Sequence, residues 1–167
     1  MSHPLRAGET SGAHDFFGEP FAPRRPFYRG HAQTMAGNFL PRRNELPSAE
    51  ERLIRVEPEV QVLCHCHWQA QPSAATTLIL VHGLEGSSDS QYVIGTGSKA
   101  WRAGMNVVRM NMRNCGGTEQ LGPTLYNSAM SADVGVVAET LIREEALPRI
   151  AFAGFSMGGN LVLKLLG

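Results

Sequence analysis

The sequence predicts an α/β fold, in which a mostly parallel sheet is flanked by helices. In the second half of the chain, short runs that are apolar on both faces alternate with longer segments of helical periodicity. Strands that alternate with helices imply crossover connections and therefore parallel pairing. The chain has 167 residues, of which 43% are hydrophobic and 18% charged, so it can form the core of one domain.

The charge balance and the cysteine count exclude several classes of protein. Fifteen Lys and Arg residues balance fifteen Asp and Glu residues, whereas binding to nucleic-acid phosphates needs a basic excess. Three cysteines are too few for a disulfide framework. No stretch reaches the roughly 18 consecutive apolar residues of a membrane span, and no apolar signal segment follows the first residues. We therefore expect a cytoplasmic protein with no nucleic-acid partner and no integral membrane segment.

Residues 1–50 differ in composition from the rest of the chain. They contain six of the ten prolines and six arginines, and they show no sustained apolar period. We expect a disordered tip and then an arm on the surface of a domain formed by residues 51–167. The arginines indicate a solvated basic segment, with an anionic-surface patch as the alternative. The aromatic residues expected to anchor the arm are Phe16, Phe17, Phe21, Phe27 and Tyr28.

The first predicted elements of the domain are a pair of strands, Arg52–Val56 and Val60–Trp68, separated by a turn that contains proline. The run Leu78–Val81 is apolar on both faces, which is typical of a strand covered on both sides. A helix is then predicted over Tyr92–Ala103, because a glycine that can cap it follows directly.

The second half of the domain continues this alternation. Val107–Met110 is predicted as a strand, and a helix is expected from Ser131 onward. Its core-facing stripe consists of Val134, Val137, Ala138, Leu141 and Ile142. A short strand over Ile150–Ala153 and a helix over Leu161–Leu166 complete the pattern.

The junction between that last strand and helix has the sequence Gly154-Phe155-Ser156-Met157-Gly158. A serine between two such glycines at a strand-to-helix turn is typical of a nucleophile elbow. The tight turn forces the serine into a strained backbone conformation, and larger side chains at the glycine positions would collide with neighbouring backbone. The backbone N–H of Met157, at the helix N-terminus, is then free to meet an oxyanion. The alternative is a glycine-rich turn without a catalytic role.

A second motif, His82-Gly83-Leu84-Glu85-Gly86, follows the strand predicted to be buried on both sides. Ester cleavage needs N–H donors aimed at the developing negative charge, and one of them comes from a loop in this position. We assign that donor to the backbone N–H of Leu84, with Gly83 allowing the loop to approach. We expect His82 to make an orienting hydrogen bond, and its alternative role is that of a catalytic base.

Together these motifs resemble the α/β-hydrolase superfamily and, within it, the YheT-like branch, also called family-4 α/β hydrolases. The resemblance begins near Phe27 and rests on four segments, Gly30–Thr34, His82–Ser88, Asn106–Arg113 and Gly154–Asn160. The sequence departs from the branch at Asn114, Asn127 and Ala129, where glycine, histidine and glycine are usual. The resemblance implies a carboxylic-ester hydrolase that forms an acyl-enzyme on Ser156 and acts on short-chain or lipid-like acylglycerol esters, without a cofactor or metal.

The remaining members of a catalytic triad are not found in the expected place. In this fold the nucleophile precedes the acid, and the acid precedes the histidine. The residues after Ser156 contain neither an acid nor a histidine. We therefore expect this chain to be the amino-terminal portion of a hydrolase, truncated after the elbow and inactive by itself. The alternative is a non-catalytic remnant or binding module, and a nicotinamide-dependent oxidoreductase ranks third.

Other candidate constellations have simpler interpretations. In a strand, the two cysteines of Cys64-His65-Cys66-His67 face away from the two histidines, so the four cannot close around one metal. The glycines of Gly95-Thr96-Gly97 fall inside a predicted helix and not at its start, unlike a dinucleotide-binding loop. Asp133 is a candidate triad acid, but it lies near the start of a predicted helix, where a carboxylate interacts favourably with the helix dipole. Cys115 is interpreted as a small loop residue, not a reactive thiol.

Overall fold

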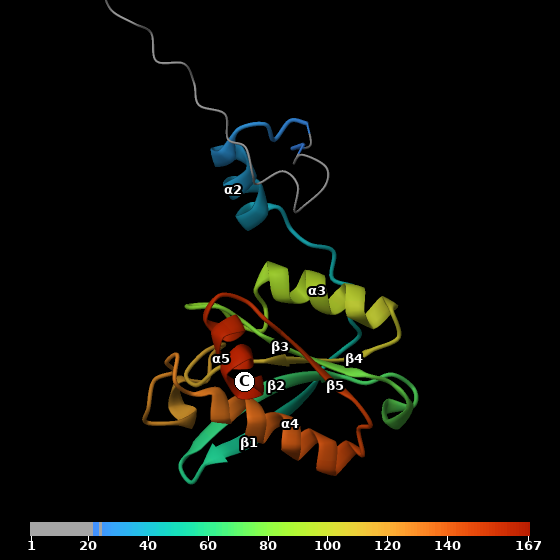
Figure 1. The fold of residues 1–167 in the computed structure, drawn as a ribbon, viewed down its shortest axis with the longest axis vertical. Coiled ribbons are helices and arrows are strands. Elements are labelled where there is room, and N and C mark those ends of the chain that lie inside the picture. Colours follow the sequence, from blue (N-terminus) through green and yellow to red (C-terminus); the bar gives the residue numbers. More distant parts are fainter. Residues whose placement is uncertain (1–21, 24) are drawn as a thin grey trace, which may run out of the picture. The chain divides into compact units, whose positions relative to one another are not determined.

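The computed structural model describes residues 22–23 and 25–167. The chain divides into two compact units, Met1–Leu40 and Pro41–Gly167 (Figure 1). The predicted disordered tip and three of its expected aromatic anchors, Phe16, Phe17 and Phe21, lie outside the described residues.

The described part of the first unit contains one helix, α2 (Gly30–Phe39). Two side chains stabilise its first turn: the Gln33 side-chain amide donates to the Phe27 carbonyl at 2.9 Å, and the Thr34 hydroxyl donates to the Gly30 carbonyl at 3.1 Å. The sequence analysis did not predict this helix, because it has no apolar stripe of helical period. Its formation depends on local hydrogen bonds and not on a buried face.

The second unit is built on one five-stranded sheet, which confirms the predicted α/β class. Its strands are β1 (Glu50–Glu57), β2 (Val60–His67), β3 (Thr77–Val81), β4 (Asn106–Met110) and β5 (Ile150–Gly154). Their order in the sheet is β1-β2-β4-β3-β5. The sheet is mixed: β2 pairs antiparallel with β1 and β4, whereas β3 pairs parallel with β4 and β5.

Helices cover both faces of this sheet (Figure 1). Helix α3 (Gln91–Arg102) connects β3 to β4 and packs on one face. Helix α4 (Ser131–Glu145) connects β4 to β5, and it packs with α5 (Met157–Leu166) on the other face. Helix α5 begins directly after Ser156, four residues before the predicted Leu161, so both following glycines are helical. No helix in the described part of the chain combines the length and the apolar character that a bilayer crossing requires.

Strand β3 is buried on both sides, as predicted for the run Leu78–Val81. Ile79 belongs to the cluster beneath α4 and α5, and Leu80 belongs to the cluster beneath α3, and both are fully buried. Leu46, from the segment that enters this unit, packs into the α3 cluster. Helix α3 lies close to the sheet because Gly97 faces it, where an added Cβ would lie 3.2 Å from a Val107 methyl carbon.

One buried ionic cluster fixes the long loop between β4 and α4. The guanidinium of Arg113 is 2% exposed and pairs with both carboxylate oxygens of Asp133, at 2.6 and 2.7 Å. It also pairs with both oxygens of Glu57, at 2.7 and 3.0 Å, and it donates to the Thr124 hydroxyl. The hydrogen bonds that Arg113 donates, first to Asp133 and then to Glu57, raise its pKa, so its charge is permanent. Asp133 lies in the first turn of α4, and the sequence analysis missed its arginine partner.

Candidate active site

The geometry of the elbow is set by two glycines on either side of Ser156. This serine lies between β5 and α5 with φ 52° and ψ −115°, a conformation that L-residues rarely adopt. A Cβ on Gly154 would overlap the backbone of Gly158, and a Cβ on Gly158 would overlap the carbonyl oxygens of Val81 and His82. Only glycine fits at these two positions, so the turn is as tight as the sequence analysis expected.

The sheet register brings the second motif to this elbow. Val81 of β3 is the parallel partner of Gly154 of β5, so Gly83 and Ser156 each lie two residues beyond the end of that pairing. A Cβ placed on Gly83 would lie 3.3 Å from the Ser156 Cβ and 3.2 Å from the Phe155 carbonyl oxygen. The two motifs, more than 70 residues apart in the sequence, therefore meet at one edge of the sheet.

The loop between β3 and α3 uses almost all of its amide groups internally. Across residues 83–90 of the described structure, every backbone N–H donates a hydrogen bond except that of Leu84. The acceptors, in order along the chain, are Tyr92, Tyr126, Gly83, Ser90, Asn111 and twice Ser87. The Leu84 N–H is thus left for a ligand, in the loop that contacts the serine.

The start of α5 offers a second unused donor. The N–H groups of Gly158 and Asn160 donate to the carbonyl oxygens of Phe155 and Ser156, at 2.9 and 3.1 Å. The N–H of Met157, the first residue of the helix, has no acceptor within the described structure. The use of both free N–H groups by an oxyanion stays a prediction, and their location beside the serine supports it.

His82 follows β3 directly and is completely buried. Its Nδ1 lies 2.7 Å from the Gly83 carbonyl oxygen, and its Nε2 lies 3.0 Å from the backbone N of Met112. A backbone N–H can only donate, so Nε2 accepts and the ring proton is on Nδ1. Burial lowers the pKa of His82, which keeps the ring neutral. Both ring nitrogens are occupied, which favours the orienting role over that of a base for Ser156.

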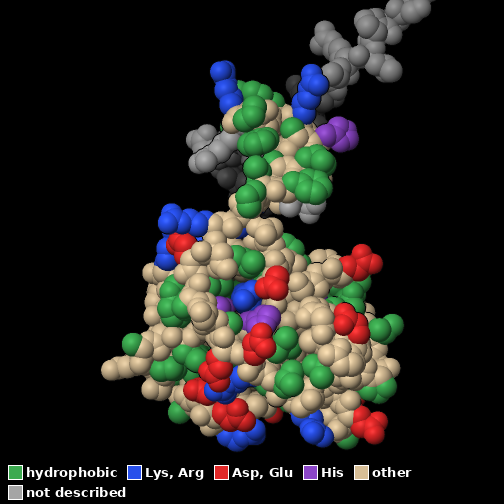
Figure 2. Space-filling model, turned by 180° about the vertical axis from the view of Figure 1, so that it is seen from behind, with side chains coloured by type: hydrophobic (Ala, Val, Ile, Leu, Met, Phe, Trp, Pro, Cys, Tyr) green, Lys and Arg blue, Asp and Glu red, His purple; other side chains and the backbone are tan. Residues whose placement is uncertain are grey.

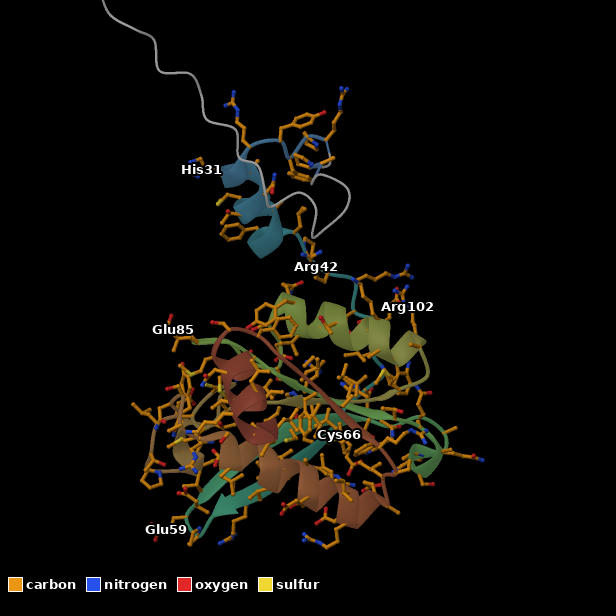
Figure 3. All side chains as sticks on the ribbon, in the orientation of Figure 1. His31, Arg42, Glu59, Cys66, Glu85 and Arg102 are labelled. Atoms are coloured by element: carbon orange, nitrogen blue, oxygen red, sulfur yellow. The ribbon has the colours of Figure 1, made fainter. Side chains whose placement is uncertain are left out.

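Sequence analysis missed two residues that contact the loop, Tyr92 and Tyr126. Their hydroxyl oxygens accept hydrogen bonds from the N–H groups of Gly83 and Glu85. No signal in the sequence could have identified them, because they follow from the packing of α3 and of the long loop before α4. In Figure 3, Glu85 marks this loop, and its side chain projects away from the body of the unit.

The cysteine-histidine run in β2 alternates as predicted. Cys64 and Cys66 are buried in the core cluster (Figure 3 labels Cys66), and burial raises the pKa of both thiols. On the opposite face, His65 contacts the Ser88 hydroxyl and the Glu51 carboxylate, and His67 contacts Arg109. Figure 2 shows histidine among acidic and basic side chains on one face of this unit. Within the described residues, no group of three or more His, Cys, Asp or Glu side chains could hold a metal ion.

Two further candidates are structural. Cys115 is 7% exposed, and burial raises the pKa of its thiol, which makes it a weak nucleophile. Gly95 and Gly97 lie inside α3 and not at the end of β3, so they do not form a dinucleotide-binding loop.

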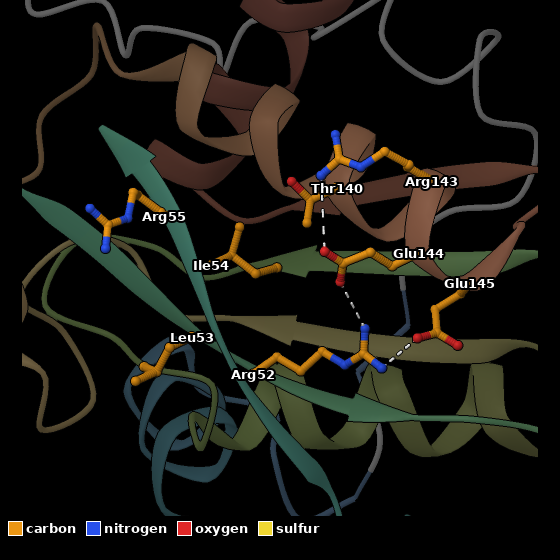
Figure 4. Close-up of a pocket in the computed structure, with 8 residues that line it drawn as sticks. All are labelled: Arg52, Leu53, Ile54, Arg55, Thr140, Arg143, Glu144 and Glu145. Atoms are coloured by element: carbon orange, nitrogen blue, oxygen red, sulfur yellow. Dashed lines mark hydrogen bonds and ion pairs between the residues drawn. The ribbon is translucent and has the colours of Figure 1, made fainter. Parts of the chain in front are cut away.

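A cavity of about 540 Å³ lies between β1 and α4 (Figure 4). Its lining is mainly charged, and none of residues 82–86 or 154–158 contributes to it. Arg52 at its mouth pairs with Glu144, at 3.3 Å, and with Glu145. Arg52, Glu144 and Glu145 are therefore paired with one another within the lining.

Comparison with known proteins assigns the family. The family model described as the alpha/beta hydrolase fold matches residues 76–167, which include both motifs of the site. The chain belongs to the α/β hydrolase fold family. Among named proteins it is 30% identical to YheT of Escherichia coli (strain K12), which is named as an esterase, over 158 residues that span 94% of this chain and 46% of YheT. It is 29% identical to the embryogenesis-associated protein EMB8 of Picea glauca over 60% of this chain and 22% of EMB8. The chain thus spans less than half the length of these relatives.

Solved structures agree on the fold. An α/β serine hydrolase without a lid from Xanthomonas campestris superposes with a TM-score of 0.60 at 22% identity, covering 73% of this chain and 58% of that one. The esterase Est1E from Butyrivibrio proteoclasticus, solved with ferulic acid bound, superposes with a TM-score of 0.61 at 17% identity, covering 68% of this chain and 46% of that one. The resemblance inferred from the motifs is therefore confirmed at the level of the fold and the family.

Proposed function

We propose that this chain carries the nucleophile and the oxyanion hole of a serine hydrolase that cleaves carboxylic esters. The observation that carries the proposal is the elbow: Ser156 is held at φ 52° between two glycines that admit no Cβ, in contact with Gly83 of the loop after β3. Relatives named as esterases support the ester as the substrate class, in a short-chain or acylglycerol-like form.

The proposed reaction starts with attack of the Ser156 Oγ on the acyl carbonyl carbon. A base removes the hydroxyl proton, and the carbonyl electron pair moves to the oxygen, where the N–H groups of Leu84 and Met157 stabilise the negative charge. Collapse of this intermediate breaks the bond to the leaving oxygen, which takes up the proton held by the base and departs as the alcohol, and the acyl group stays on the serine. Attack by water then releases the acid and restores the hydroxyl.

The base and its acidic partner are proposed to come from the part of the relatives' length that this chain does not span. No histidine follows Ser156 in the sequence, and His82 has both ring nitrogens engaged. The engagement of both His82 ring nitrogens also fits a second candidate, a non-catalytic binding module that retains the fold without the triad. The two candidates differ in whether ester turnover depends on the serine.

Replacement of the nucleophile tests the proposal. Ser156→Ala is expected to reduce turnover of an activated ester such as a nitrophenyl ester by several orders of magnitude, because the remaining acceleration comes only from binding and the oxyanion hole. Labelling with a serine-directed fluorophosphonate should be lost in parallel. The measurement is made in the hydrolase that contains this chain, with kcat and labelling recorded for each variant.

Ser73→Ala is the matched control, because Ser73 is exposed in a short 3-10 turn outside the site. It should retain normal turnover and labelling. If Ser156→Ala keeps the turnover of the unaltered enzyme, the serine is not the nucleophile. Absence of both turnover and labelling in the unaltered protein would favour the binding module.

A further inference from the structure

Two tyrosine hydroxyls hold the oxyanion loop, which we define as residues Gly83–Gly86. The N–H of Gly83 donates to the Tyr92 hydroxyl oxygen at 3.0 Å, and the N–H of Glu85 donates to the Tyr126 hydroxyl oxygen at 2.9 Å. These two donors immediately precede and follow Leu84. The one N–H in this loop without an acceptor in the described structure thus lies between two that are fixed by tyrosines.

The bond to Tyr126 acts on a strained residue. Glu85 has φ 56°, in the left-handed region that glycine favours, and another residue keeps this conformation only where its surroundings hold it. The turn is closed by a hydrogen bond from the Gly86 N–H to the Gly83 carbonyl at 3.1 Å. Relaxation of Glu85 toward a common conformation would rotate the peptides that carry the N–H groups of Glu85 and Gly86. The bond from Gly86 to the Gly83 carbonyl would then be lost, and that carbonyl shares its peptide with the N–H of Leu84.

Tyr92 links the loop to the nucleophile elbow. It lies in the first turn of α3, and its ring packs on that of Phe155, the residue before the serine, with 4.6 Å between the ring centroids. Its hydroxyl also fills the space beside Gly86, where an added Cβ would lie 2.8 Å away. One side chain of α3 therefore contacts both the loop and the elbow.

From this arrangement we infer that Tyr92 and Tyr126 are positioning residues of the oxyanion hole. They fix the peptide groups that precede and follow the Gly83–Leu84 peptide, which carries the Leu84 N–H, so that this N–H is directed at the space beside Ser156 before a substrate binds. The inference rests on the proposed function and extends it. Donors that are pre-set in this way stabilise the charge that develops in the transition state and contribute little to substrate binding. Loss of either hydroxyl should therefore lower kcat and leave KM nearly unchanged.

The test compares Tyr92→Phe and Tyr126→Phe with the unaltered hydrolase that contains this chain. Each variant keeps its ring and loses one acceptor, and we expect about a tenfold decrease in kcat with KM changed less than about twofold. The affinity for a trifluoromethyl ketone, which forms a tetrahedral adduct on the serine, should weaken by the same factor. Tyr28→Phe is the matched control, because Tyr28 lies in the first unit, and it should leave kcat unchanged.

A measurement that does not depend on turnover keeps this inference separate from the proposed function. Amide hydrogen exchange should show protection at Gly83 and Glu85, selectively lost at Gly83 in Tyr92→Phe and at Glu85 in Tyr126→Phe. Unchanged exchange, or a change in KM alone, would overturn the inference even where Ser156→Ala abolishes turnover. If each variant loses protection only at its own residue but the unaltered protein cleaves no ester, the tyrosine contacts are real and the esterase proposal is overturned instead.

Discussion

At the scale of single residues, the site depends on places where no side chain fits. The backbone of Ser156 is strained, and the strain persists because Gly154, Gly158 and Gly83 let three backbone segments approach within contact distance. A side chain at any of these glycines would push apart the groups that must act together. The residues that determine the chemistry of the elbow are thus the serine and its small neighbours.

Substitution of Gly83 by a larger residue tests whether the site depends on this close approach. Gly83→Val is expected to displace the Leu84 N–H from the serine, because the added atoms would meet the Ser156 Cβ and the Phe155 carbonyl. Loss of one oxyanion donor costs about 2.7–4 kcal/mol of transition-state stabilisation, mainly in kcat. Steady-state kinetics on an activated ester measure the effect.

The control for this variant is Gly37→Val, because no atom lies within 4 Å of a Cβ added at Gly37. It should leave kcat and KM unchanged. If Gly83→Val raised KM and left kcat intact, the loop would bind the substrate and would not supply an oxyanion donor.

At the scale of elements, local patterns predicted most of the second unit. The two-sided burial of β3 appears directly in its sequence, because a strand in a parallel sheet must be apolar where it packs. Four members of the predicted stripe of α4 are buried, whereas the fifth, Ile142, is 42% exposed, so the prediction is wrong at that residue. The tight turn at Ser156 and the close approach of Gly83 were also predictable, because a close backbone approach requires glycine. Helix α2 was not predicted, since it lacks an apolar stripe.

The contacts between elements were not predictable. Tyr92 and Tyr126 reach the oxyanion loop through packing between segments that are distant in sequence, and no spacing rule describes such a contact. The same holds for Arg113, whose partners come from the β1–β2 hairpin and from α4. Sequence patterns report the environment of a residue but not the identity of its partners.

Arg113 carries a prediction at this scale. Its planar guanidinium binds two carboxylates in a bidentate manner, which a lysine ammonium cannot do. Arg113→Lys should therefore lower the free energy of unfolding by about 1–3 kcal/mol, measured by equilibrium urea denaturation. Arg143→Lys is the control, because Arg143 is 71% exposed and its ion pair is 3.9 Å long, and it should change the stability by less than about 0.5 kcal/mol. Equal stability of the two variants would show that the ionic cluster does not hold the loop.

At the scale of the whole second unit, the strand order creates the site. Strands β3 and β5 are neighbours and run parallel, so the segments that follow them leave the sheet at the same edge. That edge joins the oxyanion loop to the elbow, and His82 connects it to the segment after β4 through the N–H of Met112. The buried His82 therefore couples the stability of the sheet to the geometry of the site.

This coupling predicts how stability depends on pH. Burial, followed by the nearby charge of Arg109, lowers the pKa of His67 to about 4, and burial also lowers the pKa of His82. As the pH falls below about 6.5, the unfolded chain takes up protons that the folded protein excludes, so the folded state loses stability. For His67 the loss should continue to about pH 4, and the slope is up to about 1.4 kcal/mol per pH unit for each histidine that the fold keeps neutral. The pKa values of Glu50 and Glu57 are lowered from 4.5 by their arginine partners, so the stability that these carboxylates contribute is lost only as the pH falls through 4.5 and below.

Urea denaturation at several pH values between 7.5 and 5 measures this slope. His67→Gln should flatten it by the share of one histidine, because glutamine can still accept a hydrogen bond from Arg109 but does not titrate in this range. His31→Gln serves as the control, since His31 is exposed on α2 and should leave the slope unchanged. Unfolding becomes more favourable as the pH falls, because a histidine that is buried in its neutral form takes up a proton only when the chain unfolds. A stability that stays constant between pH 7 and 5, or an equal response of the two variants, would therefore contradict the prediction.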